Sequence, residues 1–260
     1  MEVRPIHLFG DSIGKGILFD EGRGRYAIAR ERCDIQLQEA LGVTVENHAR
    51  MGATVEEGLA DFLDSGDVSG TIVAIEYGGN DCDLHWDEVA KDPTAYHEAK
   101  VPLETFRRVL KEFVLRVRSR NAAPLLVTPP PLDAQRFFNW VTKGLDAQAV
   151  LQYLIDVQNI YKWQERYAIA VRDVALETGC DIFDLRDVFL SRRDVADLIS
   201  LDGMHPNTKG HMLITESLLR KDYLYIKPAL PARSLPRLVK AAGPKHFHIR
   251  PSLQIQNLPS

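Results

Sequence analysis

FGDSIGKG, residues 9–16, directly follows the short strand-like run of residues 6–8. A glycine-rich turn after a first strand can cradle a phosphate, or it can lift a side chain into a cleft. The spacing does not fit G-x-x-x-x-G-K-[ST], because Gly16 stands where a magnesium-binding hydroxyl belongs. The G-x-G-x-x-G spacing of a dinucleotide site is also absent. The turn therefore predicts that Ser12 is presented to a cleft.

Short β-branched runs alternate with segments of helical period along most of the chain. This alternation predicts an α/β fold with a parallel sheet covered by helices on both faces, and ligands at the carboxyl ends of the strands. The expected strands are residues 5–10, 43–49, 71–79, 123–131 and 180–185. The expected helices are residues 26–41, 55–64, 101–120, 153–178 and 207–221.

The bulk composition is that of an ordinary globular protein. The chain has 260 residues, of which 45% are hydrophobic and 26% charged, and a formal net charge of −4. This balance gives no reason to expect a nucleic-acid partner, and no apolar run is long enough for a membrane span. The first residues do not resemble a signal peptide, which predicts a cytoplasmic protein. Three cysteines without a CxxC pair argue against a disulfide framework.

A change of composition near residue 222 predicts two parts, a catalytic domain over residues 1–221 and a C-terminal arm over residues 222–260. The arm holds six of the fourteen prolines, six Lys or Arg residues and a single acid. Such a proline density disfavours a regular helix or a central strand. The arm also contains many apolar residues, so we expect it to pack on its own domain or to support a homo-oligomer.

Serine is a weak nucleophile unless a histidine, oriented by a third group, removes its proton. His205 stands out because LDGMHPNTKGH, residues 201–211, puts Asp202 three residues before it in a tight turn. Across such a turn the carboxylate can reach Nδ1 and leave Nε2 free to take a proton. Taken alone, an Asp-x-x-His pair is more often a surface turn or a helix cap.

An attacking serine also needs donors for the oxyanion that forms. Asn80, in EYGGND at residues 76–81, follows the most apolar strand and can point its amide to the same rim of the sheet. Gly52, in ARMGATV at residues 49–55, follows another strand, and its backbone N–H can approach a ligand closely because no Cβ intervenes.

Taken together, these blocks resemble the GDSL or SGNH hydrolase family. The matching pieces are GDS at 10–12, the glycine at 52, GGND at 78–81 and DGMHP at 202–206, in order, within roughly residues 3–221. The resemblance implies a three-layer α/β/α fold of flavodoxin-like type with a five-stranded parallel sheet.

The resemblance also implies roles for the site residues. Ser12 would be the nucleophile, His205 the general base and then acid, and Asp202 the carboxylate that orients the histidine. The backbone amides of Ser12 and Gly52, with the side chain of Asn80, would form the oxyanion hole. No cofactor and no metal are expected.

Other residues near these blocks are candidates for the pocket. His85 and Trp86 follow Asn80 in a long segment, residues 83–102, which could form a lid, and Arg25 could bind an anionic group of a substrate. The acidic cluster at residues 81–83 is interpreted as a solvated turn and not as a metal site.

The leading hypothesis is hydrolysis of a small or carbohydrate-borne acyl ester through an acyl-enzyme. Two alternatives stay open. A thioesterase or lysophospholipase would need a longer apolar channel for its acyl chain. A non-catalytic binding module could use the same cleft, with the basic arm contacting an acidic partner.

Overall fold

The computed structural model describes residues 4–220 and the strand at residues 224–225. Within this part of the chain, a six-stranded sheet has the order β4-β1-β5-β6-β7-β8, and all neighbouring pairs are parallel except β7 with β8. The five parallel strands thus follow the flavodoxin-like order, which confirms the predicted fold class. The strands are β1 (Ile6–Gly10), β4 (Val45–Asn47), β5 (Ile72–Glu76), β6 (Ala123–Val127), β7 (Asp181–Phe183) and β8 (Leu224–Tyr225).

The central strands β1 and β5 are buried at every position after the first. Burial on both faces explains why they are almost continuously apolar in the sequence. Their register pairs Ile6 with Ile72 and Gly10 with Glu76, so the two strands end level with each other. The turn that contains Ser12 therefore begins directly beside the segment that contains Asn80.

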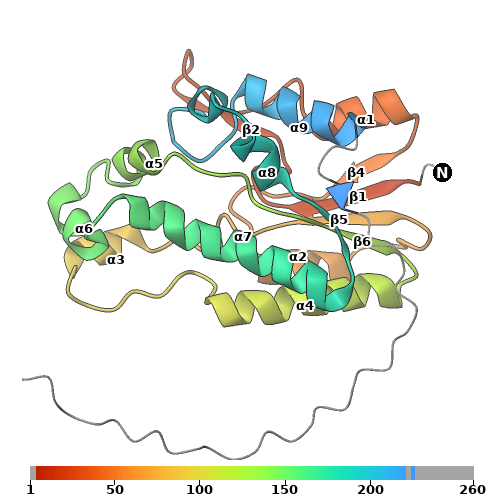
Figure 1. The fold of residues 1–260 in the computed structure, drawn as a ribbon, viewed down its shortest axis with the longest axis horizontal. Coiled ribbons are helices and arrows are strands. Elements are labelled where there is room, and N and C mark those ends of the chain that lie inside the picture. Colours follow the sequence, from red (N-terminus) through yellow and green to blue (C-terminus); the bar gives the residue numbers. More distant parts are fainter. Residues whose placement is uncertain (1–3, 221–223, 226–260) are drawn as a thin grey trace, which may run out of the picture. The chain divides into compact units, whose positions relative to one another are not determined.

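Helices cover both faces of the sheet and form the outer two layers (Figure 1). One face carries α1 (Cys33–Leu41), α8 (Leu185–Leu190) and α9 (Thr208–Arg220). The other face carries α2 (Val55–Leu63), α4 (Leu103–Ser119) and α7 (Gln158–Thr178). Three shorter helices lie beyond the carboxyl ends of the strands, namely α3 (Trp86–Lys91), α5 (Ala134–Val141) and α6 (Ala147–Leu154).

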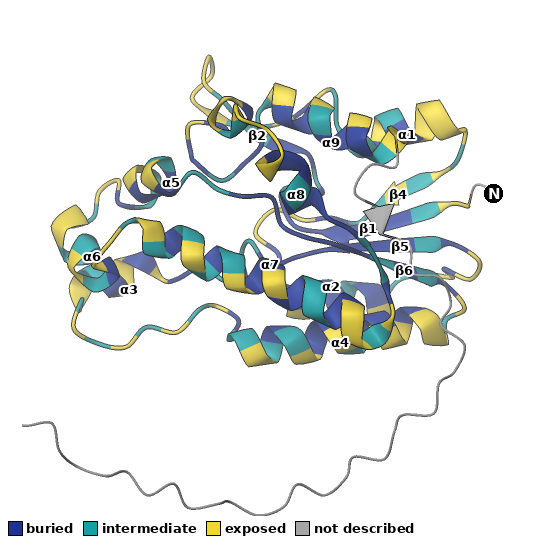
Figure 2. Ribbon diagram, viewed as in Figure 1, coloured by how far each residue is buried: buried dark blue, intermediate teal, exposed yellow. Residues whose placement is uncertain are grey.

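The main core lies between the sheet and the helices α2, α4 and α7 (Figure 2). Helix α4 contributes a stripe at three- and four-residue spacing, as its sequence predicts. Phe106, Leu110, Phe113 and Val117 on this stripe are all fully buried. A second core lies under α8 and α9, and a third joins α3, α5 and α6.

The helix expected over residues 26–41 is shorter than predicted. Residues 25–28 form the strand β3 (Arg25–Ile28), which pairs antiparallel with β2 (Ile17–Asp20), and α1 begins only at Cys33. Residues 17–28 form an antiparallel hairpin in which Phe19 pairs with Tyr26, instead of starting the helix. The hairpin is also tied to a distant loop, since the backbone N–H of Phe19 donates to Ser200 Oγ at 3.4 Å.

The predicted arm over residues 222–260 lies outside the described residues, apart from β8. By its contacts the chain divides into two units, Met1–Lys227 and Pro228–Ser260. In the described residues, no helix combines the length and the apolar character that a membrane crossing requires.

Candidate active site

Ser12 lies in a tight turn at the carboxyl end of β1. The turn is closed by backbone hydrogen bonds from Lys15 to Asp11 and from Gly16 to Ile13, at 3.0 and 2.9 Å. Gly10 begins the turn, and a Cβ there would meet the backbone oxygen and a carboxyl oxygen of Glu76 at 3.1 Å. Only a residue without a side chain lets β1 approach β5 this closely at the point where the chain turns.

Ser12, His205 and Asp202 form one hydrogen-bonded chain, and all three side chains are buried. His205 Nδ1 lies 2.6 Å from Asp202 Oδ2, and His205 Nε2 lies 2.8 Å from Ser12 Oγ. A carboxylate only accepts, so Nδ1 carries the hydrogen and Nε2 is left to accept the hydroxyl proton of Ser12. The structure thus joins two residues that are 193 positions apart in the sequence.

The turn that carries Asp202 and His205 also holds the carboxylate in place. Asp202 Oδ1 accepts the backbone N–H groups of Met204 and His205 at 3.0 and 3.1 Å. Burial by itself raises the pKa of Asp202, but the hydrogen bond and charge of His205 and these backbone donors outweigh it and lower the pKa below its usual value. Asp202 is therefore an anion that can stabilise an imidazolium.

A buried pair of carboxyl groups lies beneath the nucleophile turn. Glu76 Oε2 accepts the backbone N–H of Gly14 at 3.2 Å and that of Asp11 at 3.4 Å. Asp11 in turn accepts from the backbone N–H of Ile13 at 2.8 Å, so it braces the loop. Burial raises the pKa of both carboxyl groups, and for Glu76 the charge of Asp11 raises it further. Both groups therefore favour the protonated form more than exposed carboxyl groups do.

The two remaining candidates for the oxyanion hole differ in what they contact. Gly52 has a φ of +82°, is exposed, and has open space where a Cβ would lie. The side-chain amide of Asn80 donates to Asp11 Oδ2 and to the backbone oxygen of Ala53, both at 3.2 Å. Both amide hydrogens of Asn80 therefore have acceptors within the protein.

Ser12 and His205 open into a small cleft of about 60 Å³, which we call the Ser12 cleft. Its walls come from the segment after Asn80, from the proline-rich stretch after β6, and from α5 and α7. Most of the lining is apolar or aromatic, which suits the uncharged part of a ligand. The apolar and aromatic side chains that line the cleft are Ile13, Trp86, Pro129, Pro130, Leu132, Phe137, Ile160, Trp163 and Met204.

Of the three predicted pocket residues, only Trp86 lies in the wall of the Ser12 cleft. His85 is exposed at the start of α3, because the next residue, Trp86, occupies the buried face of this short helix. Arg25 is exposed and sits opposite Asp20 in the β2–β3 hairpin. Alternation along the strand turns Tyr26, and not Arg25, toward the site.

The interpretation of residues 81–83 as a solvated turn is wrong for Asp81. This side chain is fully buried and accepts the backbone N–H groups of Val55 and Gly78, both at 2.9 Å. It therefore anchors the beginning of α2 to the segment that carries Asn80. Its neighbour Asp83 accepts from Trp86 Nε1 at 2.8 Å and so fixes one wall of the Ser12 cleft.

Sequence reasoning missed Tyr26, whose ring lies edge-on to His205 with 5.2 Å between the ring centroids. Burial and the charge of Asp202 raise the pKa of Tyr26 to about 12, which places its hydroxyl near that carboxylate. Tyr26 is therefore a candidate donor to Asp202. Residues 26–28 are all apolar and fit a helix as well as a strand, so no local signal could have found Tyr26. The wall residues on α7 had no local signal of their partners either.

Comparison with known proteins agrees with this fold. A family model described as the GDSL-like lipase/acylhydrolase family matches residues 8–213, which is most of the chain. The three-layer α/β/α fold and the match to this family model together define a carboxylic-ester hydrolase. The chain belongs to the GDSL-like lipase/acylhydrolase family. No curated protein matches it in sequence.

Several solved structures share the fold at low sequence identity. A lipase/acylhydrolase from Enterococcus faecalis is 20% identical with a TM-score of 0.58, covering 87% of this chain and 100% of its own. An acetylxylan esterase from Geobacillus stearothermophilus is 21% identical with a TM-score of 0.58, covering 86% and 97%. A putative GDSL-like lipase from Parabacteroides merdae is 17% identical with a TM-score of 0.57, covering 84% and 96%.

Proposed function

We propose that this protein is a serine esterase that removes a small acyl group, and that Ser12, His205 and Asp202 are its catalytic triad. The observation that carries the proposal is the continuous chain from Asp202 Oδ2 through both ring nitrogens of His205 to Ser12 Oγ, with steps of 2.6 and 2.8 Å. These distances are within the range that proton transfer requires.

In the proposed mechanism, Ser12 Oγ attacks the ester carbonyl while His205 Nε2 takes the hydroxyl proton. The imidazolium is stabilised by Asp202 and then gives the proton to the leaving alcohol oxygen. Water, activated by the same histidine, attacks the acyl-enzyme and releases the acid. The backbone donors of the 202–205 turn, with Tyr26 as a further candidate donor, keep the Asp202 carboxylate aimed at Nδ1.

The developing oxyanion would be bound by the backbone N–H groups of Ser12 and Gly52 and by the amide of Asn80. The amide makes two hydrogen bonds of 3.2 Å, to Asp11 and to Ala53, which are long for this type of bond. A charged oxyanion is a stronger acceptor than a backbone carbonyl. We infer that Asn80 exchanges its contact with Ala53 for the oxyanion as the reaction proceeds.

The size of the Ser12 cleft favours a short acyl group. A volume of about 60 Å³ suits an acetyl group, whereas sites for drug-sized ligands span roughly 300–1,000 Å³. The aromatic rings of Trp86 and Trp163 in the wall offer faces on which a sugar could stack. One structural neighbour is an acetylxylan esterase, and we propose an acetylated carbohydrate as the substrate class.

The direct test is intact-mass spectrometry after incubation with a fluorophosphonate, on the wild type and on Ser12→Ala. A single adduct in the wild type only is the expected result, because an activated serine is required for labelling. Absence of an adduct in both proteins would remove the esterase proposal and favour a binding module that uses the same cleft.

A second measurement separates small-acyl esterases from thioesterases and lysophospholipases. We expect kcat/KM for p-nitrophenyl acetate to exceed that for p-nitrophenyl octanoate at least tenfold, because the cleft has no room for eight carbons. Faster turnover of the octanoyl ester would favour the long-chain alternative, while labelling of Ser12 would remain as proposed.

A cytoplasmic location and a homo-oligomer formed through residues 222–260 remain proposals, and the second has a simple test. Light scattering on the full chain and on a chain that ends at residue 227 would compare their masses. An oligomer that becomes a monomer on truncation would support the role of the arm, and an unchanged mass would remove it.

A further inference from the structure

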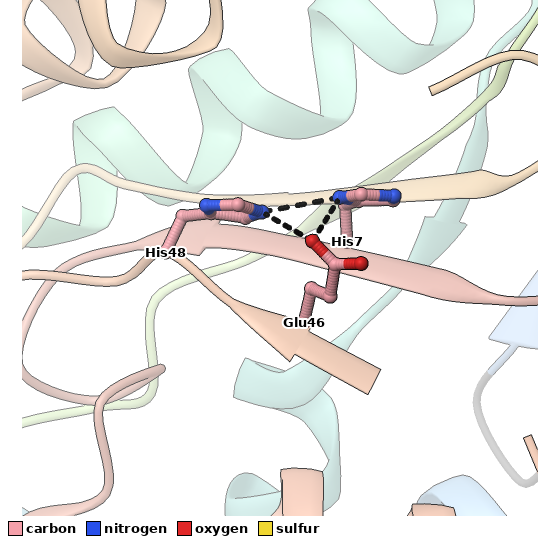
Figure 3. A group of neighbouring side chains, drawn as sticks. All are labelled: His7, Glu46 and His48. Atoms are coloured by element: carbon pink, nitrogen blue, oxygen red, sulfur yellow. Dashed lines mark hydrogen bonds and ion pairs between the residues drawn. The ribbon is translucent and has the colours of Figure 1, made fainter. Parts of the chain in front are cut away.

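A group of potential metal ligands, His7, Glu46 and His48, clusters at the pairing of β1 with β4 (Figure 3). His7 is on β1 and pairs in register with Glu46 on β4, and His48 follows directly after β4. Residues 46 and 48 are two apart, so their side chains point to the same side of the sheet. Phe9, two residues after His7, stacks on the ring of His48 with 4.4 Å between centroids.

The polar atoms of this group converge on one point. His7 Nδ1 and His48 Nε2 are 3.1 Å apart, and Glu46 Oε2 lies 3.6 Å from the first and 3.8 Å from the second. Tetrahedral coordination with metal–ligand bonds of about 2.0–2.2 Å separates the ligand atoms by roughly 3.3–3.6 Å. The triangle therefore has nearly the size that a tetrahedral ion requires.

We propose that His7, Glu46 and His48 bind a divalent transition-metal ion of the zinc type, with the fourth position open to water. Two imidazoles and one carboxylate form a ligand set that prefers zinc, cobalt, nickel or copper to magnesium or calcium. The proposal is independent of the esterase mechanism, because none of the three residues lines the Ser12 cleft.

The surroundings suit such an ion. The side chain of His7 is 9% exposed, that of His48 is 31% exposed and that of Glu46 is 56% exposed, so an ion can enter from the solvent beside Glu46. A metal ion binds the neutral form of each imidazole through a ring lone pair.

An ion bound by His7, Glu46 and His48 would join two neighbouring strands of the sheet. The backbone N–H of His48 donates to the backbone oxygen of Leu8 at 2.9 Å, so the pairing of β4 with β1 continues to this residue. An ion held by both strands would fix β1, which leads to Ser12, against the segment that leads to Gly52.

A hydrogen bond between the two rings also accounts for their short separation, so the test must detect the metal itself. The full chain is stripped with a chelator, which is then removed, and titrated with Zn²⁺ by calorimetry. Co²⁺ serves as a second probe, because tetrahedral coordination produces strong visible absorption. We expect binding at this site with a stoichiometry of one ion per chain, together with a rise in Tm.

The variants Glu46→Gln and His48→Gln test which residues bind. Each variant should weaken Zn²⁺ binding by more than the roughly 10–100-fold that is typical of substitutions next to, but outside, the ligand shell. His97→Gln is the control, since His97 contacts the backbone oxygen of Asp92 in another part of the chain. This control should bind Zn²⁺ like the wild type.

Two results would overturn the proposal. One is a wild-type chain that binds no Zn²⁺ at micromolar to millimolar concentrations. The other is unchanged binding in Glu46→Gln, which would assign the ion to another group such as His205 with Asp202. Because Glu46 is more than half exposed, this variant keeps the test decisive even if His48→Gln fails to fold.

Discussion

Glu76 Oε2 lies 3.2 Å from the backbone N–H of Gly14 and accepts its hydrogen, so a buried carboxyl group at the end of β5 supports the nucleophile turn from below. The same oxygen accepts the backbone N–H of Asp11, whose own carboxylate accepts from Ile13 and Asn80. The turn with Ser12 and the candidate oxyanion donor Asn80 thus rest on one pair of carboxyl groups, and burial raises the pKa of both.

The first prediction concerns the pH dependence of stability. Burial and the charge of Asp11 raise the pKa of Glu76 well above its value of about 4.3 in the unfolded chain. The contribution of this group is therefore full below about pH 4 and is lost as the pH rises through the raised pKa of Glu76.

Glu76→Gln keeps an oxygen for the backbone donors and an N–H for Asp11, but it does not titrate. We expect its free energy of unfolding, from urea titrations between pH 5 and 9, to fall less with pH than that of the wild type. One proton contributes a slope of at most about 1.4 kcal/mol per pH unit. Glu98→Gln, at an exposed position, is the control. Parallel curves for the wild type and Glu76→Gln would show that Glu76 is ionised.

The second prediction concerns the orientation of the histidine. Asp202→Asn replaces the acceptor of His205 Nδ1–H with a group that can stabilise the wrong tautomer. We expect kcat for an acetyl ester to fall by roughly 10³–10⁴ while KM changes little, as in other serine triads. Asp67→Asn is a matched control, because Asp67 also accepts a backbone N–H two residues ahead, from Ser69 at 2.9 Å, but in an exposed turn. A loss of less than tenfold in Asp202→Asn would contradict the proposed role.

The third prediction tests the residue that sequence reasoning missed. Tyr26→Phe keeps the ring beside His205 and removes the hydroxyl near Asp202. Hydrogen bonds to charged groups contribute about 1.5–3 kcal/mol, of which we expect a part to appear as a 3- to 30-fold loss of kcat. Tyr153→Phe removes a hydroxyl that donates to the backbone oxygen of His97, and it should leave kcat unchanged. Equal effects of the two variants would mean that Tyr26 has only a structural role.

The fourth prediction separates the two sites of the molecule. The triad supplies both a nucleophile and a base, so the proposed mechanism needs no metal. Treatment with EDTA should leave kcat for an acetyl ester within about twofold of the untreated value, and any metal bound at His7, Glu46 and His48 would affect Tm alone. A large loss of kcat that added Zn²⁺ restores would mean that the chemistry itself depends on a metal.

The sequence could predict those site residues whose signals lie within a short stretch of the chain. Ser12 follows a strand at a glycine-rich turn, and Asp202 is three residues from His205, so each could be found without knowing how distant segments meet. Tyr26 could not, because its segment was interpreted as a helix and its strand depends on pairing within a hairpin. Glu76 is only one residue of the strand expected over residues 71–79, and its role appears only when Gly10 lies beside it.

The cleft walls and the proposed metal site could not be predicted from the sequence for the same reason. Trp163 lines the cleft from near the beginning of α7, where a helical period indicates burial but not the partner. His7 and His48 are far apart in the sequence and meet only through the pairing of β1 with β4. Sequence periodicity predicts which face of an element is buried, whereas these contacts depend on the order and register of the strands.

The fifth prediction concerns Gly52, whose proposed role is to offer its backbone N–H to the oxyanion. Its φ of +82° costs a residue with a Cβ about 1–2 kcal/mol, although the space for a methyl group is open. Gly52→Ala should therefore lose stability and also shift the N–H, which lowers kcat roughly 10- to 100-fold.

Gly70 provides a matched control, because its φ is +75° and its Cβ position is equally open, but it precedes β5 at the opposite end of the strands from Ser12. Gly70→Ala should lose a similar free energy of unfolding in urea and keep its kcat for an acetyl ester. If both variants lose stability and neither loses kcat, Gly52 is a turn residue only, and the oxyanion must be bound by Ser12 and Asn80 alone.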